Sequence, residues 1–183
     1  MDIMIIVYAV LAYFIGSIPS GLIIGKTFFN TDVRQYGSKN IGATNTYRVI
    51  GLKAALPVFL CDALKGAAGV VLLSSYGPMY MILGGILAMM GHNWSIFLGF
   101  KGGRGVATGL GVLIALSPLV ALLCFLVWGI IVYFTKLVSL GSIVAAALVP
   151  VLMYVTGESY WFVGFGGLAA LFVIVRHWDN IKR

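Results

Sequence analysis

Long apolar runs take up most of this chain, and they constrain its fold more than any other feature. Stretches of about 20 apolar residues are long enough to cross the hydrocarbon core of a bilayer as helices. The chain is 61% hydrophobic and only 9% charged, so a soluble core built from 183 residues would not hold this much apolar surface. The sequence therefore predicts an all-α, polytopic integral membrane protein formed by one domain, residues 1–183.

The apolar runs divide into seven predicted spans. The runs are Ile3–Ile24, Ala54–Ser74, Met79–Phe100, Val106–Thr135, Val138–Thr156 and Tyr160–Val175. The fourth run is too long for one ordinary span, and Pro118 disfavours helix at Ser117 and removes a helical hydrogen bond. We therefore predict two helices there, Val106–Leu116 and Pro118–Thr135, of which the first is short for a full crossing.

The basic residues predict how the chain is oriented. All of them except Lys65 follow the first, third, fifth or seventh predicted span: Lys26, Arg34, Lys39, Arg48, Lys53, Lys101, Arg104, Lys136, Arg176, Lys182 and Arg183. Positive residues collect on the cytoplasmic side of membrane proteins, so we expect the N-terminus outside and the C-terminus in the cytoplasm. The net charge of +7 then reflects topology, and no nucleic-acid partner is expected. Asp2 and the late position of the first cations argue against a cleaved signal peptide.

Two polar, glycine-containing loops are predicted on the cytoplasmic side. The first, Gly37–Gly51, reads GSKNIGATNTYRVIG, and it offers donors suited to anionic oxygens from Ser38, Asn40, Thr44, Asn45 and Arg48, with Gly42 among them. The second, KGGRG, contains Lys101, Gly102, Gly103, Arg104 and Gly105 and opens into a predicted helix, whose N-terminus favours anions. Taken alone, the second loop also fits a glycine-rich turn with a G-x-x-x-G helix contact.

Weaker signals lie in the tail and inside the spans. His177 and Asn180 have the spacing of one helical face, and His177 is either a base, a donor to phosphate or an interfacial residue. Ser139 is either a helix N-cap or a ligand donor. Asp62 and Lys65 lie three residues apart at membrane depth, where a salt-bridged structural pair competes with a Lys65 that reaches the polar site.

The residue inventory limits the chemistry. Only Asp32 and Asp179 are cytoplasmic carboxylates outside the apolar runs, and Cys61 and Cys124 lie inside them. A metal site or a paired-carboxylate mechanism therefore lacks its groups, and no metal or cofactor is expected. The sequence also contains no G-x-S-x-G motif. A cationic, acid-poor cavity at the inner leaflet suits phosphate ligands, each of which brings about −1.5 to −2 charges at pH 7.

At these residues the chain resembles the bacterial PlsY family, the acyl-phosphate:glycerol-3-phosphate acyltransferases. The three family motifs correspond to SKNIGATNTYRVIG, GHNWSIFLGFKGGRGVATGLG and RHWDNIKR, in the same order, and GSIPSGLIIGK resembles the family's first helix. The resemblance covers essentially the whole chain. Arg104 departs from the lysine expected in many members, which keeps the charge but changes its geometry.

The resemblance implies transfer of a fatty acyl group from acyl phosphate to the 1-hydroxyl of glycerol 3-phosphate, which gives lysophosphatidate and phosphate in phospholipid synthesis. It implies that Ser38, Arg48, His177 and Asn180 are essential, and that Gly102, Gly103 and Gly105 form the glycerol-phosphate loop. The expected location is the bacterial cytoplasmic (inner) membrane, with a site that faces the cytoplasm. A monomer is compatible with the sequence.

Two other classes of protein remain open from the residues. A transporter or channel for a small phosphorylated anion would also gather cations and glycine-broken helices around a polar cavity. The polar clusters, however, crowd one face and not the midplane, and no inverted repeat is visible. A structural membrane subunit is the third option, and it would not need three polar motifs.

Overall fold

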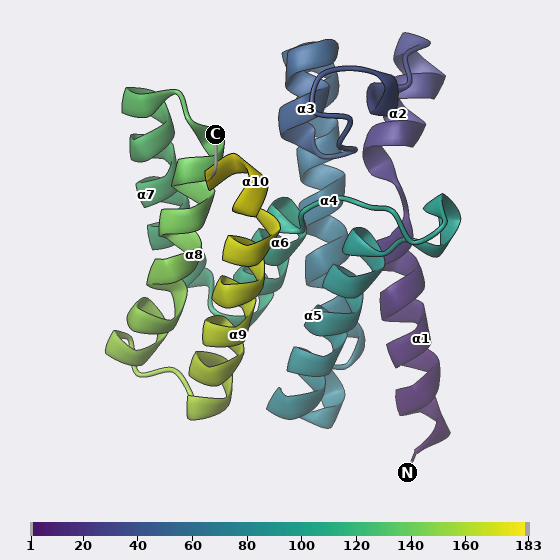
Figure 1. Ribbon diagram of the computed structural model, residues 1–183. Coiled ribbons are helices and arrows are strands. Elements are labelled where there is room, and N and C mark those ends of the chain that lie inside the picture. Colours follow the sequence, from purple (N-terminus) through teal and green to yellow (C-terminus); the bar gives the residue numbers. More distant parts are fainter. Residues whose placement is uncertain (1, 182–183) are drawn as a thin grey trace. The chain divides into compact units, whose positions relative to one another are not determined.

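The computed structural model describes residues 2–181, and these residues form helices and no strands (Figure 1). The prediction of an all-helical chain is therefore confirmed. The chain divides into two compact units, Met1–Val112 and Leu113–Arg183. Lys182 and Arg183, the last two cations of the predicted cytoplasmic set, lie outside the described residues.

The first unit contains five α-helices and most of a sixth. They are α1 (Ile3–Ser17), α2 (Ser20–Phe29), α3 (Ala43–Val49), α4 (Leu52–Leu72), α5 (Pro78–Asn93) and α6 (Val106–Leu116), with 3₁₀ turns η1 (Val33–Gln35), η2 (Ser74–Tyr76) and η3 (Ile96–Leu98). Helices α1, α4 and α5 pack against one another, and α2 and α3 both contact α4 (Figure 1). Helices satisfy their own backbone hydrogen bonds, which is why apolar segments adopt them in lipid.

Glycines allow the helices of this unit to approach very closely. A Cβ on Gly16 of α1 would lie 2.2 Å from the carbonyl oxygen of Ala88 in α5. A Cβ on Gly111 of α6 would lie 1.8 Å from the carbonyl oxygen of Ala63 in α4. Since lipid provides little hydrophobic driving force between helices, such backbone contact is a main source of packing energy in membranes.

The first predicted span is broken, which corrects the prediction of one continuous helix over Ile3–Ile24. Helix α1 ends at Ser17 and α2 begins at Ser20, with a bend of 45° between them. Pro19 lacks an N–H group and disfavours helical geometry at Ile18. The interruption leaves the backbone carbonyls of Ser17 and Ile18 available to side chains of neighbouring helices.

Within residues 2–181, length and composition identify four segments that qualify as membrane spans: Leu52–Tyr76, Pro78–Leu98, Pro118–Thr135 and Val138–Val155. The bent pair α1 and α2 raises the number to five if it counts as one span. Helix α6 and helix α9 (Tyr160–Arg176) are apolar but shorter. The predicted division at Ser117 is confirmed, because α6 ends at Leu116 and α7 begins at Pro118, where proline is favoured.

The second unit is built from consecutive helices that pack in chain order. These are α7 (Pro118–Thr135), α8 (Val138–Val155), α9 and the short α10 (Trp178–Ile181). Helix α7 contacts α8, and α8 contacts α9. Ser159 caps α9 by accepting from the N–H of Phe162, and the Ser117 hydroxyl donates to the Glu158 carboxylate.

Candidate functional site

The first polar loop is organised around the buried side chain of Asn45. Its Nδ2 group donates to the carbonyl oxygens of Val33 and Asn40, both at 2.8 Å, and to that of Tyr36 at 3.3 Å. Its Oδ1 accepts from the N–H of Ser38 at 2.8 Å. Phosphate binding by Asn45 stays a prediction, and the structure gives this amide another task, which is to hold the loop that carries Ser38.

Replacement of Asn45 should therefore unfold this loop. Asn45→Ala leaves several buried backbone groups without a partner, each at a cost of about 1–3 kcal/mol. Asn45→Asp keeps the acceptor for the N–H of Ser38, but it replaces the donating amide nitrogen with an oxygen that faces three carbonyl oxygens. This variant should therefore destabilise the loop at least as much as Asn45→Ala. Thermal unfolding in detergent, together with proteolysis of residues 33–42, measures the effect. A melting temperature equal to that of the unmodified protein would contradict this role.

The other candidate residues of the first loop are more accessible. Ser38 and Arg48 are exposed, and Asn40, Gly42 and Thr44 are half-buried. Asn40 Oδ1 accepts from the N–H of Gly42 at 2.8 Å, which fixes the turn that begins α3. The loop therefore presents the Ser38 hydroxyl and the Arg48 guanidinium at its surface, while Asn45 supports it from within.

The second loop rests on the end of α5. The N–H of Gly103 donates to the carbonyl oxygen of His92 at 3.0 Å. A Cβ at Gly102 would lie 2.1 Å from that carbonyl oxygen, and a Cβ at Gly103 would lie 2.0 Å from Nε2 of the His92 ring. Only glycine fits at these two positions without movement of His92. Lys101, which precedes them, is exposed, and Arg104, which follows them, is half-buried.

Gly105 ends this loop in a left-handed conformation beside an unsatisfied amide. Its φ is +78°, and a Cβ there would lie 3.0 Å from Nδ2 of Asn93. Asn93 is 1% exposed, and neither of its amide atoms has a hydrogen-bond partner within residues 2–181. A buried amide is costly without a partner, so a water molecule or ligand is expected to meet it. The G-x-x-x-G interpretation has less support, since Gly109 makes only ordinary contact with Met89.

Gly105→Ala should impair the protein more than Gly99→Ala. Both glycines have positive φ, where an L-residue costs about 1–2 kcal/mol. No atom lies within 4 Å of a Cβ built at Gly99, so that variant measures backbone strain alone. We expect both variants to lose stability and only Gly105→Ala to lose turnover as well, because its methyl group displaces Asn93. Equal turnover of the two variants would contradict a functional role for the Gly105 position.

The bend between α1 and α2 connects the two loops within the first unit. Ser95 Oγ donates to the carbonyl oxygen of Ser17 at 2.6 Å. This bond connects the segment that leads into the second loop to the α1–α2 bend. On the other side, a Cβ at Gly21 would lie 1.9 Å from the carbonyl oxygen of Ile41 in the first loop. Residues 17–21 therefore contact the segments that carry both sets of candidate residues.

Asp62 and Lys65 form the predicted ion pair inside α4. Lys65 Nζ lies 2.7 Å from Asp62 Oδ1, and both side chains are buried. Lys65 also donates to the carbonyl oxygen of Ile18 at the bend, at 3.0 Å. The interpretation of a salt-bridged pair is confirmed, and the lysine extends toward the α1–α2 break.

The candidate residues of the second unit also gather. Asn180 Nδ2 donates to Ser139 Oγ, and the N–H of Asn180 donates to the carbonyl oxygen of His177 at 2.8 Å. Ser139 is not the N-cap of α8, a position that Leu137 occupies. His177 and Asn180 do not share one continuous helix, because His177 lies at the C-cap of α9 and Asn180 lies in α10. The spacing argument was wrong in geometry, although the two residues remain neighbours.

The His177 ring has a defined hydrogen bond. Its Nδ1 lies 2.8 Å from the carbonyl oxygen of Val173, one turn earlier in α9. A carbonyl oxygen can only accept, so Nδ1 carries the proton of this bond. In the neutral imidazole the lone pair is then on Nε2, the atom suited to accept a proton.

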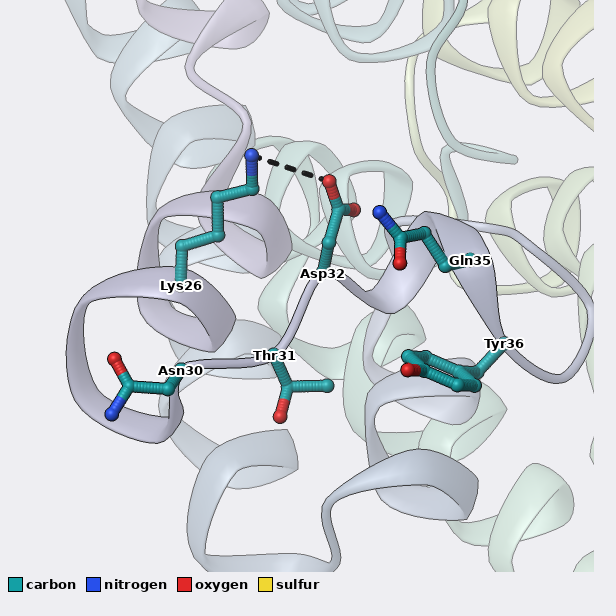
Figure 2. A pocket seen from close by; sticks show the side chains of 6 residues that line it. All are labelled: Lys26, Asn30, Thr31, Asp32, Gln35 and Tyr36. Carbon is teal, nitrogen blue, oxygen red and sulfur yellow. Dashed lines mark ion pairs between the residues drawn. The ribbon is translucent and has the colours of Figure 1, made fainter.

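A separate polar pocket lies beside the first loop. Its volume is about 390 Å³, and Figure 2 shows its lining of Lys26, Asn30, Thr31, Asp32, Gln35 and Tyr36, none of which is a candidate residue. Hydrogen bonds from Arg34 hold the pKa of Asp32 well below its usual range, and Lys26 lies 3.3 Å from the same carboxylate. Within the described part of the chain, no three His, Cys, Asp or Glu side chains could hold a metal ion together.

These features define an all-helical membrane protein with two polar loops that contain glycines and cations, and with a buried ion pair in α4. The chain belongs to the glycerol-3-phosphate acyltransferase family, whose model matches residues 6–183. It is 45% identical over 178 residues to the glycerol-3-phosphate acyltransferase of Fusobacterium nucleatum subsp. nucleatum, with 96% of this chain and 92% of the relative covered. It is 47% identical over 175 residues to glycerol-3-phosphate acyltransferase 2 of Moorella thermoacetica, with 95% and 90% covered.

Two solved structures resemble the chain along nearly its whole length. Both are crystal structures of PlsY (YgiH), an integral membrane glycerol 3-phosphate acyltransferase. Its glycerol 3-phosphate form matches with a TM-score of 0.92 and 38% sequence identity. The match covers 98% of this chain and 90% of the solved chain. Its lysophosphatidic acid form has a TM-score of 0.90 and 37% identity, with the same coverage. The resemblance to the PlsY family is thereby confirmed.

Sequence reasoning missed Asn93 and the use of His92. Asn93 is one more polar residue in GHNWS, and no spacing rule relates it to Gly105. The contact of His92 with Gly103 depends on a reversal of the chain at residues 95–101 that includes positive φ at both Gly99 and Phe100. The only available signal in the sequence was that HN lies shortly before a glycine-rich loop.

Proposed function

We propose that this protein transfers a fatty acyl group from an acyl phosphate to the 1-hydroxyl of glycerol 3-phosphate, which gives lysophosphatidate and phosphate. The observation that carries the proposal is the likeness along almost the whole chain to an acyltransferase solved in a glycerol 3-phosphate form and in a lysophosphatidic acid form. One form corresponds to the acceptor and the other to the product of this reaction.

The substrates supply two anions that the loops must neutralise. Arg48, Ser38 and backbone N–H groups of Asn40 to Thr44, other than that of Gly42, which donates to Asn40 Oδ1, hold one phosphate. The other phosphate is held by Lys101, Arg104 and the glycine-rich loop, with Ser139, His177 and Asn180 acting in the same step. Charge-assisted hydrogen bonds of this kind are about twice as strong as neutral ones, and they orient the ligands as well as bind them.

Direct attack is the mechanism that this donor favours. An acyl phosphate is a mixed anhydride with a good leaving group, so no covalent enzyme intermediate is needed. The glycerol oxygen forms a bond to the acyl carbon, the bond from that carbon to the phosphate oxygen breaks, and phosphate leaves with the electron pair. Alignment and neutralisation of two anions supply most of the catalysis.

The proton of the attacking hydroxyl has two possible acceptors. One is Nε2 of His177, whose Nδ1 is held by the Val173 carbonyl. The other is a phosphate oxygen of the substrate itself. The two routes differ in how far turnover depends on His177.

The same proposal includes the topology and the location. Seven helices cross or enter the bilayer, with the N-terminus outside and the C-terminus in the cytoplasm. The active site then faces the cytoplasm at the inner membrane of a bacterium, where the acyl tail lies against lipid. Both units serve one acyltransferase domain, and a monomer is sufficient.

A comparison of acyl donors tests the reaction. Purified protein in detergent is incubated with labelled glycerol 3-phosphate and an acyl phosphate, an acyl-coenzyme A or an acyl carrier protein thioester of the same chain length. We expect lysophosphatidate from the acyl phosphate alone. Product from either thioester and none from the acyl phosphate would overturn the proposed donor.

A search for an acyl-enzyme tests direct attack. The protein is incubated with acyl phosphate without acceptor, and peptides that contain Ser38 are examined by mass spectrometry. We expect unmodified Ser38. An acyl ester at Ser38 that glycerol 3-phosphate then discharges would establish a covalent route.

A further inference from the structure

A buried charge network lies directly behind the glycine-rich loop. It consists of Asp62 and Lys65 on α4 and His92 on α5, whose side chains are 2%, 5% and 4% exposed. Asp62 Oδ1 is 2.7 Å from Lys65 Nζ and 3.7 Å from His92 Nδ1, so the carboxylate lies between the ammonium and the imidazole. The network therefore joins two helices in the interior of the first unit.

Stability alone does not account for such a network. A buried ion pair gains little over well-packed apolar residues of similar volume, although removal of one partner costs about 3–5 kcal/mol. Ionisable residues in a membrane-spanning helix are costlier still, and they mark functional regions by default. The contacts of the three side chains indicate what this network does.

Each end of the network reaches a piece of irregular backbone. Lys65 Nζ donates to the carbonyl oxygen of Ile18, where the first span is broken, at 3.0 Å. His92 carries the loop at the other end: its carbonyl oxygen accepts from Gly103, and its Nε2 lies 2.0 Å from the place of a Gly103 Cβ. Lys101 and Arg104 flank the two glycines that contact His92. The position of His92 therefore fixes the backbone positions from which both cationic side chains extend.

We propose that Asp62, Lys65 and His92 are positioning residues that hold the Lys101–Gly105 loop in its binding conformation and thereby set the affinity for glycerol 3-phosphate. This inference rests on the proposed function for the identity of the ligand. The three residues act through the loop and do not touch the substrate. Their loss should therefore raise the KM for glycerol 3-phosphate, while the KM for acyl phosphate stays unchanged.

The decisive variants separate positioning from stability. Lys65→Met alone leaves Asp62 buried without its cation, and it should lower the melting temperature strongly. The double variant Asp62→Leu/Lys65→Met removes both charges and should restore much of that stability. We expect its KM for glycerol 3-phosphate to remain about 10-fold or more above that of the unmodified protein, since a displaced loop no longer aligns its ligand. Recovery of KM together with stability would overturn the inference.

Two further variants keep the test decisive if the charge variants fail to fold. His92→Ala leaves the ion pair intact and removes the ring that supports Gly103, so it should raise the same KM. Gly69→Ala on α4 places a methyl group 2.7 Å from the Gly84 carbonyl oxygen, and it should lower stability with KM unchanged. An unchanged KM in His92→Ala, or an equal rise in Gly69→Ala, would overturn the inference.

Calorimetric binding of glycerol 3-phosphate without acyl donor separates this inference from the proposed function. Failure of the unmodified protein to bind glycerol 3-phosphate would reject the proposed function itself. Binding by the unmodified protein with the same dissociation constant in His92→Ala would reject only the positioning role.

Discussion

His177→Ala should lower kcat by about 10²–10⁴-fold, the usual contribution of a general base. The expectation follows from a hydrogen bond of the ring: Nδ1 donates to the Val173 carbonyl, and this places the lone pair of the neutral ring on Nε2. His177 also adjoins Asn180, which bonds to Ser139, so the ring lies among the other candidate residues of its unit. Steady-state turnover at saturating acyl phosphate and glycerol 3-phosphate measures the loss.

His177→Asn is the matched control for this prediction. An asparagine amide can donate to the Val173 carbonyl as Nδ1 does, but it cannot accept a proton at neutral pH. If His177 is the base, both variants lose activity to a similar extent while their melting temperatures differ. Nearly intact turnover in His177→Ala would leave the substrate phosphate as the proton acceptor, and direct attack would survive.

Arg48→Ala should lower kcat/KM by about 10²–10³-fold, the range measured when one preorganised donor to a developing anion is removed. Arg48 lies on α3 with an exposed side chain, at the surface of a loop that Asn45 holds from within. Arg48→Lys keeps the charge but loses the planar pair of donors that matches a phosphate. We therefore expect an intermediate loss for lysine.

Lys53→Ala is the control for Arg48. Lys53 is an exposed cation five residues later, in the first turn of α4, and it belongs to neither loop. Its removal lowers the net charge by the same amount, so a general electrostatic effect on substrate capture would appear in both variants. We expect kcat/KM to fall only in Arg48→Ala. Equal losses would contradict a specific contact between Arg48 and phosphate.

The helices that sequence predicted best are those with an unambiguous boundary signal. The division at Ser117 follows from one proline, and the observed helices end and begin where that proline requires. The same rule applied to Pro19 would have predicted the break in the first span. The apolar run through Ile24 masked it, because hydropathy measures composition and does not register one missing N–H group.

The candidate site was predictable in its residue types and less so in its contacts. Cations, glycines and hydroxyl groups near predicted span ends led to the prediction of a phosphate-binding site, which stays a prediction. The supporting role of Asn45 in the first loop is visible only in the folded structure. Asn45 lies near exposed donors in the sequence, yet its side chain bonds to four backbone groups over residues 33–40. Likewise, the i, i+3 spacing predicted the Asp62–Lys65 pair, but nothing local relates that pair to His92 or to the α1–α2 bend.

The most direct test of the central claim uses protein reconstituted in liposomes with labelled glycerol 3-phosphate and acyl phosphate outside. One preparation is divided, and the lipid fraction is assayed for labelled lysophosphatidate while the lumen is assayed for intact glycerol 3-phosphate. The acyltransferase account predicts labelled lysophosphatidate that depends on acyl phosphate, with no accumulation of intact label in the lumen. Accumulation of glycerol 3-phosphate inside the liposomes without product would contradict it and would establish a transporter.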